Sequence, residues 1–489
     1  MKPFIHKFKT KNHNYIYDVN TNQFIKVNSV IYDIIEDWGS LTMQDIISKW
    51  RNKYEIKEIK NAFEFLRLFS IKGYFSTHRP KNLWRPNFDN DFKEILDSKI
   101  NILILNITEK CNLRCKYCVY SGTYYYERTH SNYSMEWNTI EKSLKFYLSN
   151  KFFKSDNKYI SFYGGEPLLE LEKIKNIIEY ICKNFKNKCY FSMTINGTLL
   201  NEEIIKFLIK NSFFLTISLD GPKSVHDKYR VAKDGSPTFE KIIKNLSLIK
   251  KLDSKYYQNN VNFSITIAPN VSPIEIDEFF ESFEFAREKD LQVNYVIPFD
   301  TKFFEIFGNY DLKHYKEIEE LREKYIKDRI KNKQPSPFRK ALFDKILVAI
   351  HKRKIGIMGN IAPANGICIP GERRLFVSVR GKFYPCERMG EFESFCIGDI
   401  EKGLDIEKIK NLVENYITNS EKECLNCWAI RLCDLCYVNT KSGAGINFER
   451  KKEWCNGHKN FLNTSFITYA TIMESNPNAF DFVKNVKIM

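Results

Sequence analysis

The sequence predicts an α/β protein built on a parallel sheet, with a smaller module before the sheet and a cysteine-rich region after it. Between residues 101 and 300, six segments with the apolar pattern of strands alternate with segments of helical periodicity. Repeated strand–helix units imply parallel strands, because each helix returns the chain to the start of the next strand. Eleven of the thirteen cysteines form two groups, one after the first strand and one between residues 368 and 455.

The six expected strands are short and rich in apolar residues, and lie at 101–107, 159–164, 189–195, 213–219, 261–268 and 291–297. The intervening helices carry an apolar face with a 3.6-residue period, as at Ile174, Ile177, Ile178 and Ile181. In sheets of this kind the chemistry takes place at the carboxyl ends of the strands. Loops that follow the strands are therefore the places to look for functional residues.

Residues 1–85 are expected to form a separate module. Two strand-like runs flank the turn at 20–22 and predict a hairpin. Three short helices should follow, with Ser29 and Thr42 as caps of the first two and Gly73 at the end of the third. Strands with three small helices predict a winged-helix-like module. The remaining chain divides into a core at 86–300, a helical bridging segment at 301–360 and the cysteine-rich region at 361–489.

Composition and charge limit the classes of protein to which this sequence can belong. Hydrophobic residues make up 43% of the chain and charged residues 28%, as in globular proteins. No apolar run reaches membrane-spanning length and the first residues do not form a signal peptide, so we expect a cytoplasmic protein with reduced thiols and no membrane partner. The net charge of +16 favours an acidic partner. No basic run with interleaved aromatics is present, so nucleic acid is not an expected partner.

The first group of cysteines has the spacing C-x3-C-x2-C and consists of Cys111, Cys115 and Cys118. It follows directly on the first apolar strand, so the thiols lie on a loop at a strand's carboxyl end. Thiolates are soft ligands that favour iron–sulfur clusters or zinc. Three close ligands fit a cluster with one iron open to another molecule, since a closed site takes four. The alternatives are a zinc site completed by a distant residue and three unrelated buried thiols.

This loop resembles the signature of the radical S-adenosylmethionine (SAM) enzymes, with Tyr117 as the aromatic residue before the last cysteine. The resemblance implies a partial (β/α)6 barrel and a 4Fe–4S cluster on Cys111, Cys115 and Cys118. In that family the open iron binds the amino and carboxylate groups of SAM, and reduction yields a 5′-deoxyadenosyl radical. Tyr117 would pack near the adenine.

Motifs at the ends of the next strands agree with this resemblance. Strand two is followed by Gly164, Gly165 and Glu166, strand three by Asn196, and strand four by Ser218 and later Arg230. By resemblance, the two glycines and Glu166 hold the SAM amino group, and Asn196 lies near the ribose. Ser218 and Arg230 would bind the SAM carboxylate, a group that a guanidinium holds with two hydrogen bonds.

The C-terminal cysteines resemble those of the SPASM domain of radical SAM enzymes, which usually holds two auxiliary 4Fe–4S clusters. By family topology, the outer cluster would be held by Cys424, Cys427, Cys433 and Cys455. The inner cluster would be held by Cys368, Cys386 and Cys436. Cys396 has no clear counterpart in the family. It is either the fourth inner ligand or a bystander that leaves an iron open for substrate.

Two points about these cysteines remain open. The spacing between Cys433 and Cys436 is x2 where the family has x3. Zinc in place of one cluster is an alternative. The total expected from the sequence is three 4Fe–4S clusters, one for radical generation and two auxiliary, with SAM as the further cofactor.

Together the resemblances imply a radical SAM/SPASM maturase that installs a crosslink in a ribosomally made precursor peptide, most simply a thioether from cysteine sulfur to carbon. Residues 1–85 would recognise the leader of that precursor as an added strand, or else serve as a structural cap. A flavodoxin or ferredoxin would be the reductant.

Three alternatives stay open. The first is a sulfatase-maturing, formylglycine-forming enzyme, and the second a maturase that makes carbon–carbon crosslinks or decarboxylates a peptide. The third, from another class, is an iron–sulfur redox-sensing DNA-binding regulator. No acidic residue is singled out by spacing as the general base.

Overall fold

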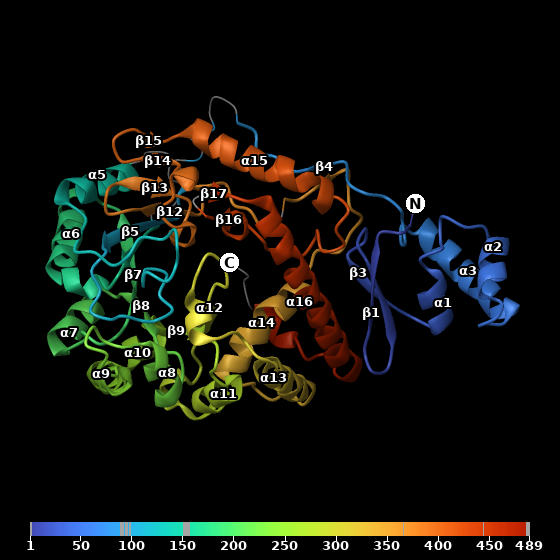
Figure 1. Ribbon diagram of the computed structural model, residues 1–489, viewed down its shortest axis with the longest axis horizontal. Helices are drawn as coiled ribbons and strands as arrows, with labels where there is room; N and C mark the ends of the chain where they lie inside the picture. The colour runs from blue at the N-terminus through green and yellow to red at the C-terminus, as the bar shows by residue number, and fades with distance from the viewer. Residues whose placement is uncertain are drawn as a thin grey trace.

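The computed structural model describes residues 2–88, 92, 96, 99–149, 157–364, 366–443 and 445–485. Figure 1 shows the parallel sheet with its helices on the left, the cysteine-rich region above and beside it in orange, and the N-terminal module protruding on the right in blue. The sequence also predicts a polar linker from His78 to Asp97, and the end of that linker lies outside the described residues.

The N-terminal module consists of a three-stranded antiparallel sheet and three helices. The strands are β1 (Ile5–Lys9), β2 (Asn14–Asp18) and β3 (Gln23–Val27), in that spatial order. The helices are α1 (Ser29–Ile34), α2 (Met43–Trp50) and α3 (Ile56–Ile71). The expected hairpin and helices are present, whereas β1 was not expected from the sequence.

The helix caps of the module differ from expectation at one position. Asn28, not Ser29, caps α1, and its side chain accepts a hydrogen bond from the backbone N–H of Ile31 at 2.9 Å. Thr42 caps α2 as expected. Gly73 follows the end of α3 with φ of 86°, a conformation that glycine adopts without steric cost.

The main sheet begins with six parallel strands whose spatial order follows the sequence, which confirms the α/β prediction. They are β5 (Ile102–Thr108), β6 (Asn157–Gly164), β7 (Lys188–Ile195), β8 (Phe214–Ser218), β9 (Val261–Ile267) and β10 (Leu291–Tyr295). The helices between them are α5 (Trp137–Leu148), α6 (Leu171–Asn184), α7 (Glu202–Lys210), α8 (Lys223–Tyr229), α9 (Phe239–Leu252), α10 (Ser254–Asn260) and α11 (Pro273–Ser282). The apolar face expected on α6 is buried.

The cysteine-rich region extends the same sheet, a feature that the sequence did not indicate. Strand β12 (Arg374–Val377) pairs in parallel with β5 on the side opposite β6. Three short antiparallel strands continue from it, namely β13 (Lys382–Tyr384), β14 (Gly398–Asp399) and β15 (Gly403–Leu404). The loop after β5 and the cysteine that follows β13 are therefore held by one ten-stranded sheet.

Further helices complete the C-terminal half: α12 (Phe303–Phe307), α13 (Leu312–Ile330), α14 (Pro337–His351), α15 (Ile406–Cys424) and α16 (Phe448–Ser475). Helix α16 runs beside the sheet of the N-terminal module (Figure 1), and the ring of Phe466 meets that of Phe24 edge-on, with centroids 4.7 Å apart. Short strands β4 (Asn82–Leu83) and β11 (Ile361–Ala362) pair in parallel. Across the described residues, every helix is too short or too polar to span a bilayer.

The end of β6 lies directly on the loop that follows β5. The backbone N–H of Gly165 donates to the carbonyl oxygen of Thr108 at 2.9 Å, and that of Glu166 donates to Lys110 at 2.8 Å. A Cβ on Gly165 would lie 2.1 Å from the carbonyl oxygen of Lys110. Glycine is required here because two backbones touch.

We predict that Gly165→Ala destabilises the protein by overpacking, a cost of about 1–3 kcal/mol. Thermal unfolding followed by circular dichroism should show a lower midpoint, and proteases should cut the 109–118 loop sooner. Gly359→Ala is the matched control, because a Cβ there would meet nothing within 4 Å. Equal midpoints for the two variants would contradict this account.

Candidate active site at the carboxyl ends of the strands

The three cysteines of the first group lie together on the loop after β5. Cys111 is buried at 9% exposure, and Cys115 and Cys118 are half-buried. Burial, followed by the charge of the neighbouring Cys115, raises the pKa of Cys118 to about 12. The loop is held by backbone hydrogen bonds to the segment after α8, including Arg114 N–H to the Val231 carbonyl at 2.7 Å. The structure thus brings the three thiols together in a low-dielectric environment.

The donor set of this loop fits an iron–sulfur cluster. Cationic iron favours thiolates, and burial alone would leave these groups as neutral thiols. In the described part of the chain, no three His, Cys, Asp or Glu side chains surround a point at the distances of a single metal ion. The ligands of a cubane each bind a different iron, so they stand further apart than the ligands of one ion.

Glu166 is the buried charge of the site. Its side chain is 1% exposed, and its two carboxylate oxygens accept hydrogen bonds from the backbone N–H groups of Asn196 (2.7 Å) and Leu168 (3.2 Å). Burial raises its pKa to about 7. No lysine or arginine of the described residues forms an ion pair with it, so the carboxylate is suited to an ammonium group from a bound molecule.

Asn196 connects the cysteine loop to the end of β7. Its side-chain N–H donates to the amide oxygen of Asn112 at 2.8 Å, and the N–H of Asn112 donates to the hydroxyl of Thr198 at the same distance. Asn112 follows Cys111 directly. Asn112 was not singled out from the sequence as a site residue, yet it fixes the loop through this network.

Asp220 organises the other side of the loop. Its carboxylate accepts hydrogen bonds from the Nε–H of Arg230 at 2.9 Å and from the hydroxyl of Tyr117. A second nitrogen of Arg230 lies 3.9 Å from the Cys115 sulfur. From the sequence, Arg230 and Tyr117 were expected only as SAM contacts, and Asp220 was not singled out. Ser218 ends β8 and is 8% exposed.

The four cysteines expected for an outer cluster line one cavity of about 80 Å³, together with Tyr416. They are Cys424, Cys427, Cys433 and Cys455. Burial, followed by the charges of the other three, raises the pKa of Cys433 to about 12. The structure therefore gathers this set in one place.

The three cysteines expected for an inner cluster also lie near one another. The pKa of Cys386 is raised to about 12, first by burial and then by the charges of Glu387, Cys436 and Cys368. Cys396 is buried and has a backbone partner of its own: its Sγ–H donates to the carbonyl oxygen of Gly398 at 3.3 Å.

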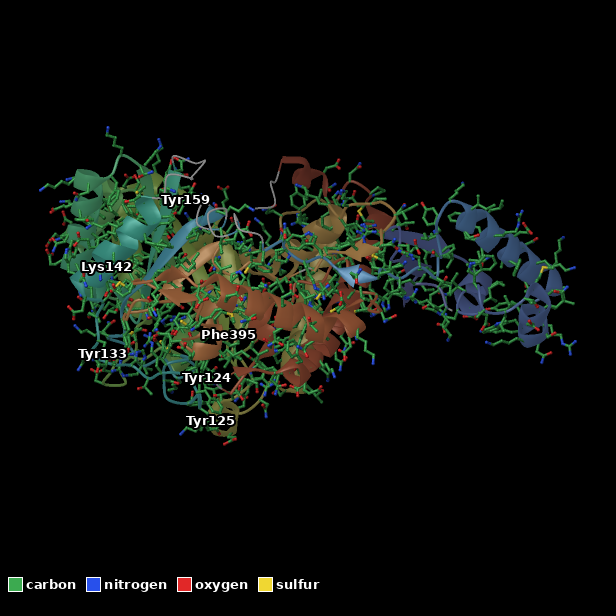
Figure 2. All side chains as sticks on the ribbon, turned by 90° about the horizontal axis from the view of Figure 1, so that it is seen from above. Tyr124, Tyr125, Tyr133, Lys142, Tyr159 and Phe395 are labelled. Atoms are coloured by element: carbon green, nitrogen blue, oxygen red, sulfur yellow. The ribbon has the colours of Figure 1, made fainter. Side chains whose placement is uncertain are left out.

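A cavity of about 140 Å³ separates the first group of cysteines from the inner group. Its lining includes Val119, next to Cys118, and Val438, two residues after Cys436. Aromatic side chains of Tyr124, Tyr126, Phe299, Phe392 and Trp454 contribute to the lining, beside the charged residues Glu127, Asp300, Arg388 and Lys441. In Figure 2, Tyr124 and Tyr125 lie together on the side of the carboxyl strand ends, far from Tyr159 near the start of β6. The cavity thus lies where a parallel sheet places its chemistry.

Glu387 is an acidic residue that the sequence did not single out, and it precedes the cavity-lining Arg388. It follows Cys386, and one carboxylate oxygen accepts from Arg374 at 2.5 Å. The other oxygen is buried and has no hydrogen-bond partner among the described residues. Its position directly after a conspicuous cysteine was the one signal available in the sequence.

Comparisons with known proteins agree with the fold and with the cysteine loop. The radical SAM superfamily model matches residues 105–283. A cysteine-type anaerobic sulfatase-maturating enzyme of Clostridium novyi is 26% identical over 395 residues, which cover 76% of this chain and 96% of the relative. The radical SAM cyclopropyl synthase TigE of Paramaledivibacter caminithermalis is 29% identical over 175 residues, 33% of this chain and 35% of the relative.

Among solved structures, native anSMEcpe with bound AdoMet and Cp18Cys peptide superposes with a TM-score of 0.56 at 25% identity, covering 79% of this chain and 99% of the other. The matched residues 105–283 include the cysteine loop and Glu166. The chain is therefore a radical SAM enzyme with SAM and iron–sulfur clusters as cofactors, and over about three quarters of its length it is similar to anaerobic sulfatase-maturating enzymes.

Proposed function

We propose that this enzyme modifies one residue of a peptide or protein substrate in the aromatic cavity between the first and inner groups of cysteines. The observation that carries this proposal is the position of the cavity: its lining includes Val119, which follows Cys118, and also Arg388 and Val438, which lie two residues after Cys386 and Cys436. A side chain in that cavity lies within reach of both groups. The similarity to a structure solved with a Cp18Cys peptide supports a peptide substrate.

Cys111, Cys115 and Cys118 would hold the radical cluster. When bound and reduced, cluster and SAM supply a 5′-deoxyadenosyl radical, which takes a hydrogen atom from the substrate. Glu166 would bind the SAM ammonium, with Gly164 and Gly165 keeping that carboxylate against the cysteine loop.

The remaining predicted contacts surround the same site. Asn196 would lie near the ribose, Ser218 and Arg230 near the carboxylate, and Tyr117 near the adenine. Asp220 would hold Arg230 and Tyr117 in place, because it accepts a hydrogen bond from each.

The auxiliary clusters would be held by the outer and inner sets of cysteines that the sequence predicted. Cys424, Cys427, Cys433 and Cys455 would hold the outer cluster, which agrees with their common cavity. Cys368, Cys386 and Cys436 would hold the inner one. The hydrogen bond of Cys396 to Gly398 favours its role as a bystander, which leaves one inner iron open to a substrate group.

Of the candidate reactions, oxidation of a cysteine or serine side chain to formylglycine has the stronger support. The relatives include cysteine-type anaerobic sulfatase-maturating enzymes over about three quarters of this chain and a serine-type enzyme over 31%. Thioether formation, the main expectation from the sequence, receives less support from these comparisons than the sulfatase-maturing alternative.

Thioether formation remains the second candidate because of the N-terminal module. The relatives match 76% of this chain at 96% of their own length, so about a quarter of this chain has no counterpart in them. A three-stranded sheet backed by helices can accept a leader peptide as a further strand. A flavodoxin or ferredoxin would supply the electrons, and the charge of +16 favours such an acidic partner.

The proposed function predicts a specific set of products. Anaerobically reconstituted enzyme with SAM, reductant and the Cp18Cys peptide should release 5′-deoxyadenosine, and Cys111→Ala, Cys115→Ala and Cys118→Ala should not. Mass spectrometry of the peptide distinguishes the reactions: formylglycine exchanges sulfur for oxygen with loss of two hydrogen atoms, whereas a thioether loses two hydrogen atoms and keeps sulfur. Normal 5′-deoxyadenosine release by all three variants would overturn the cluster assignment.

The buried position of Glu166 predicts a pH-dependent affinity for SAM. Its pKa of about 7 means that the carboxylate is about half protonated at pH 7, so SAM binding should strengthen as pH rises from about 6 to about 8 and then level off. Glu166→Gln should weaken binding about tenfold or more at pH 7.5, because a charge-assisted hydrogen bond contributes about 1.5–3 kcal/mol. Calorimetric titration at several pH values measures both effects.

In this titration Glu172→Gln is the matched control, since its carboxylate is exposed on α6. An unchanged pH profile in the Glu166→Gln variant would show that another group binds the ammonium.

Deletion of residues 1–85 separates the two candidate reactions. If the module recognises a leader, the shortened enzyme should still cleave SAM, because the core that carries Cys111 begins after it, but should lose modification of a leader-bearing precursor. If the module is a cap, modification of the short Cp18Cys peptide and of longer substrates should fall together or not at all. Duplex DNA binding by the full chain would instead support the regulator alternative.

A further inference from the structure

The loop between Cys427 and Cys433 contacts two different parts of the molecule. Ile430 lines the cavity of the outer cysteines. Trp428 and Arg431 contact the N-terminal module instead. We call these two side chains the module clamp. The clamp lies on a short loop that begins and ends at proposed cluster ligands.

The first contact of the module clamp is a ring stack. The indole of Trp428 lies parallel to the imidazole of His6 in β1, with centroids 3.7 Å apart and an angle of 9° between the planes. Tyr17 of β2 meets the same indole edge-on at 6.5 Å. Nε2 of His6 lies 2.8 Å from the side-chain oxygen of Asn463 in α16, which fixes the imidazole. Two strands of the module therefore rest on the cysteine loop.

The second contact is a set of hydrogen bonds from Arg431. One terminal nitrogen donates to the carbonyl oxygens of Asn20 at 2.9 Å and Gly356 at 2.7 Å. The other donates to the carbonyl oxygen of Lys354 at 3.1 Å. Asn20 lies in the turn between β2 and β3, and the other two lie after α14. The rigid fork of a guanidinium thus joins the turn of the module to the body.

The linker that leaves the module is tied to the same region. Leu83 of β4 lines the cavity of the outer cysteines. The carboxylate of Glu421 in α15 accepts the backbone N–H of Leu83 at 2.7 Å and two N–H groups of Arg85 at 2.9 Å each. The module is therefore held on two sides by elements that surround one proposed cluster.

We propose that the 427–433 loop is the docking site that positions the N-terminal module, and that the outer auxiliary cluster holds this loop in its docking conformation. The proposal rests on the proposed function in assigning that cluster to Cys424, Cys427, Cys433 and Cys455. Fixing both ends of a short loop removes conformational entropy that the module clamp would otherwise lose on docking. The outer cluster then has a structural task beside any transfer of electrons: it sets the position of the recognition module relative to the aromatic cavity.

Cys455→Ser tests the role of the cluster, because Cys455 lies on α16 and the loop itself stays unchanged. Iron should fall by about four atoms per chain. Hydrogen exchange should rise at least about tenfold at the amides of Gly356 and Met358, which donate across the junction to Thr21 and Asn20. Trypsin should cut the 77–88 linker sooner, while the strands β5 to β9 keep their protection.

Arg431→Ala tests the module clamp with the cluster in place. It should retain the iron of the wild type and show the same faster exchange and cleavage. Arg67→Ala is the matched control, since among the described residues the side chain of this arginine pairs only with Glu64 on an exposed face of α3.

The outcomes separate the proposal from the proposed function. Lower iron in Cys455→Ser with exchange and cleavage equal to the wild type would overturn the structural role of the cluster and leave its assignment intact. Wild-type iron in Cys455→Ser would overturn the assignment and this proposal together, while release of 5′-deoxyadenosine reports on the radical cluster independently. Unchanged exchange in Arg431→Ala would overturn the docking role of the loop.

Discussion

The active site depends on a contact between two backbones. The end of β6 lies on the loop after β5 so closely that neither Gly164 nor Gly165 has room for a side chain. The hydrogen bonds made there bring Glu166 beneath the cysteine loop and fix its direction. From Glu166 the network continues through Asn196 to Asn112, which follows the first cysteine. The buried carboxylate and the cysteines are thus parts of one rigid unit.

The ten-stranded sheet connects this rigid unit to the cysteine-rich region. Because β12 pairs with β5, the strand that carries the first cysteine group and the hairpin that carries Cys386 are neighbours in one sheet. The aromatic cavity lies between them and is lined by residues of both regions. Helix α16 brings Cys455 to the outer group and also supports the sheet of the N-terminal module. A few elements therefore connect the N-terminal module, the two groups of cysteines and the aromatic cavity.

Much of this arrangement could be predicted from the sequence, because it depends on local patterns. The apolar periods predicted the six parallel strands, and the positions of Glu166 and Asn196 after strands two and three placed them at the same edge of the sheet as the cysteine loop. The pairing of β12 could not be predicted, since four residues carry little pattern and their partner is far away in the chain. The role of Asp220 was missed for a similar reason: an aspartate beside a glycine is usually a turn residue, and only the fold brings Arg230 and Tyr117 to it.

The pairing of β12 with β5 also has a consequence for synthesis of the chain. Ile102 leaves the ribosome long before its partner Arg374, so β5 has one unpaired edge while the rest of the parallel sheet can already form. An exposed, apolar edge strand invites pairing with other chains. Contacts between residues so distant in sequence also form slowly. Expression at low temperature or with chaperones should therefore favour soluble protein, and C-terminal truncations that remove β12 should aggregate.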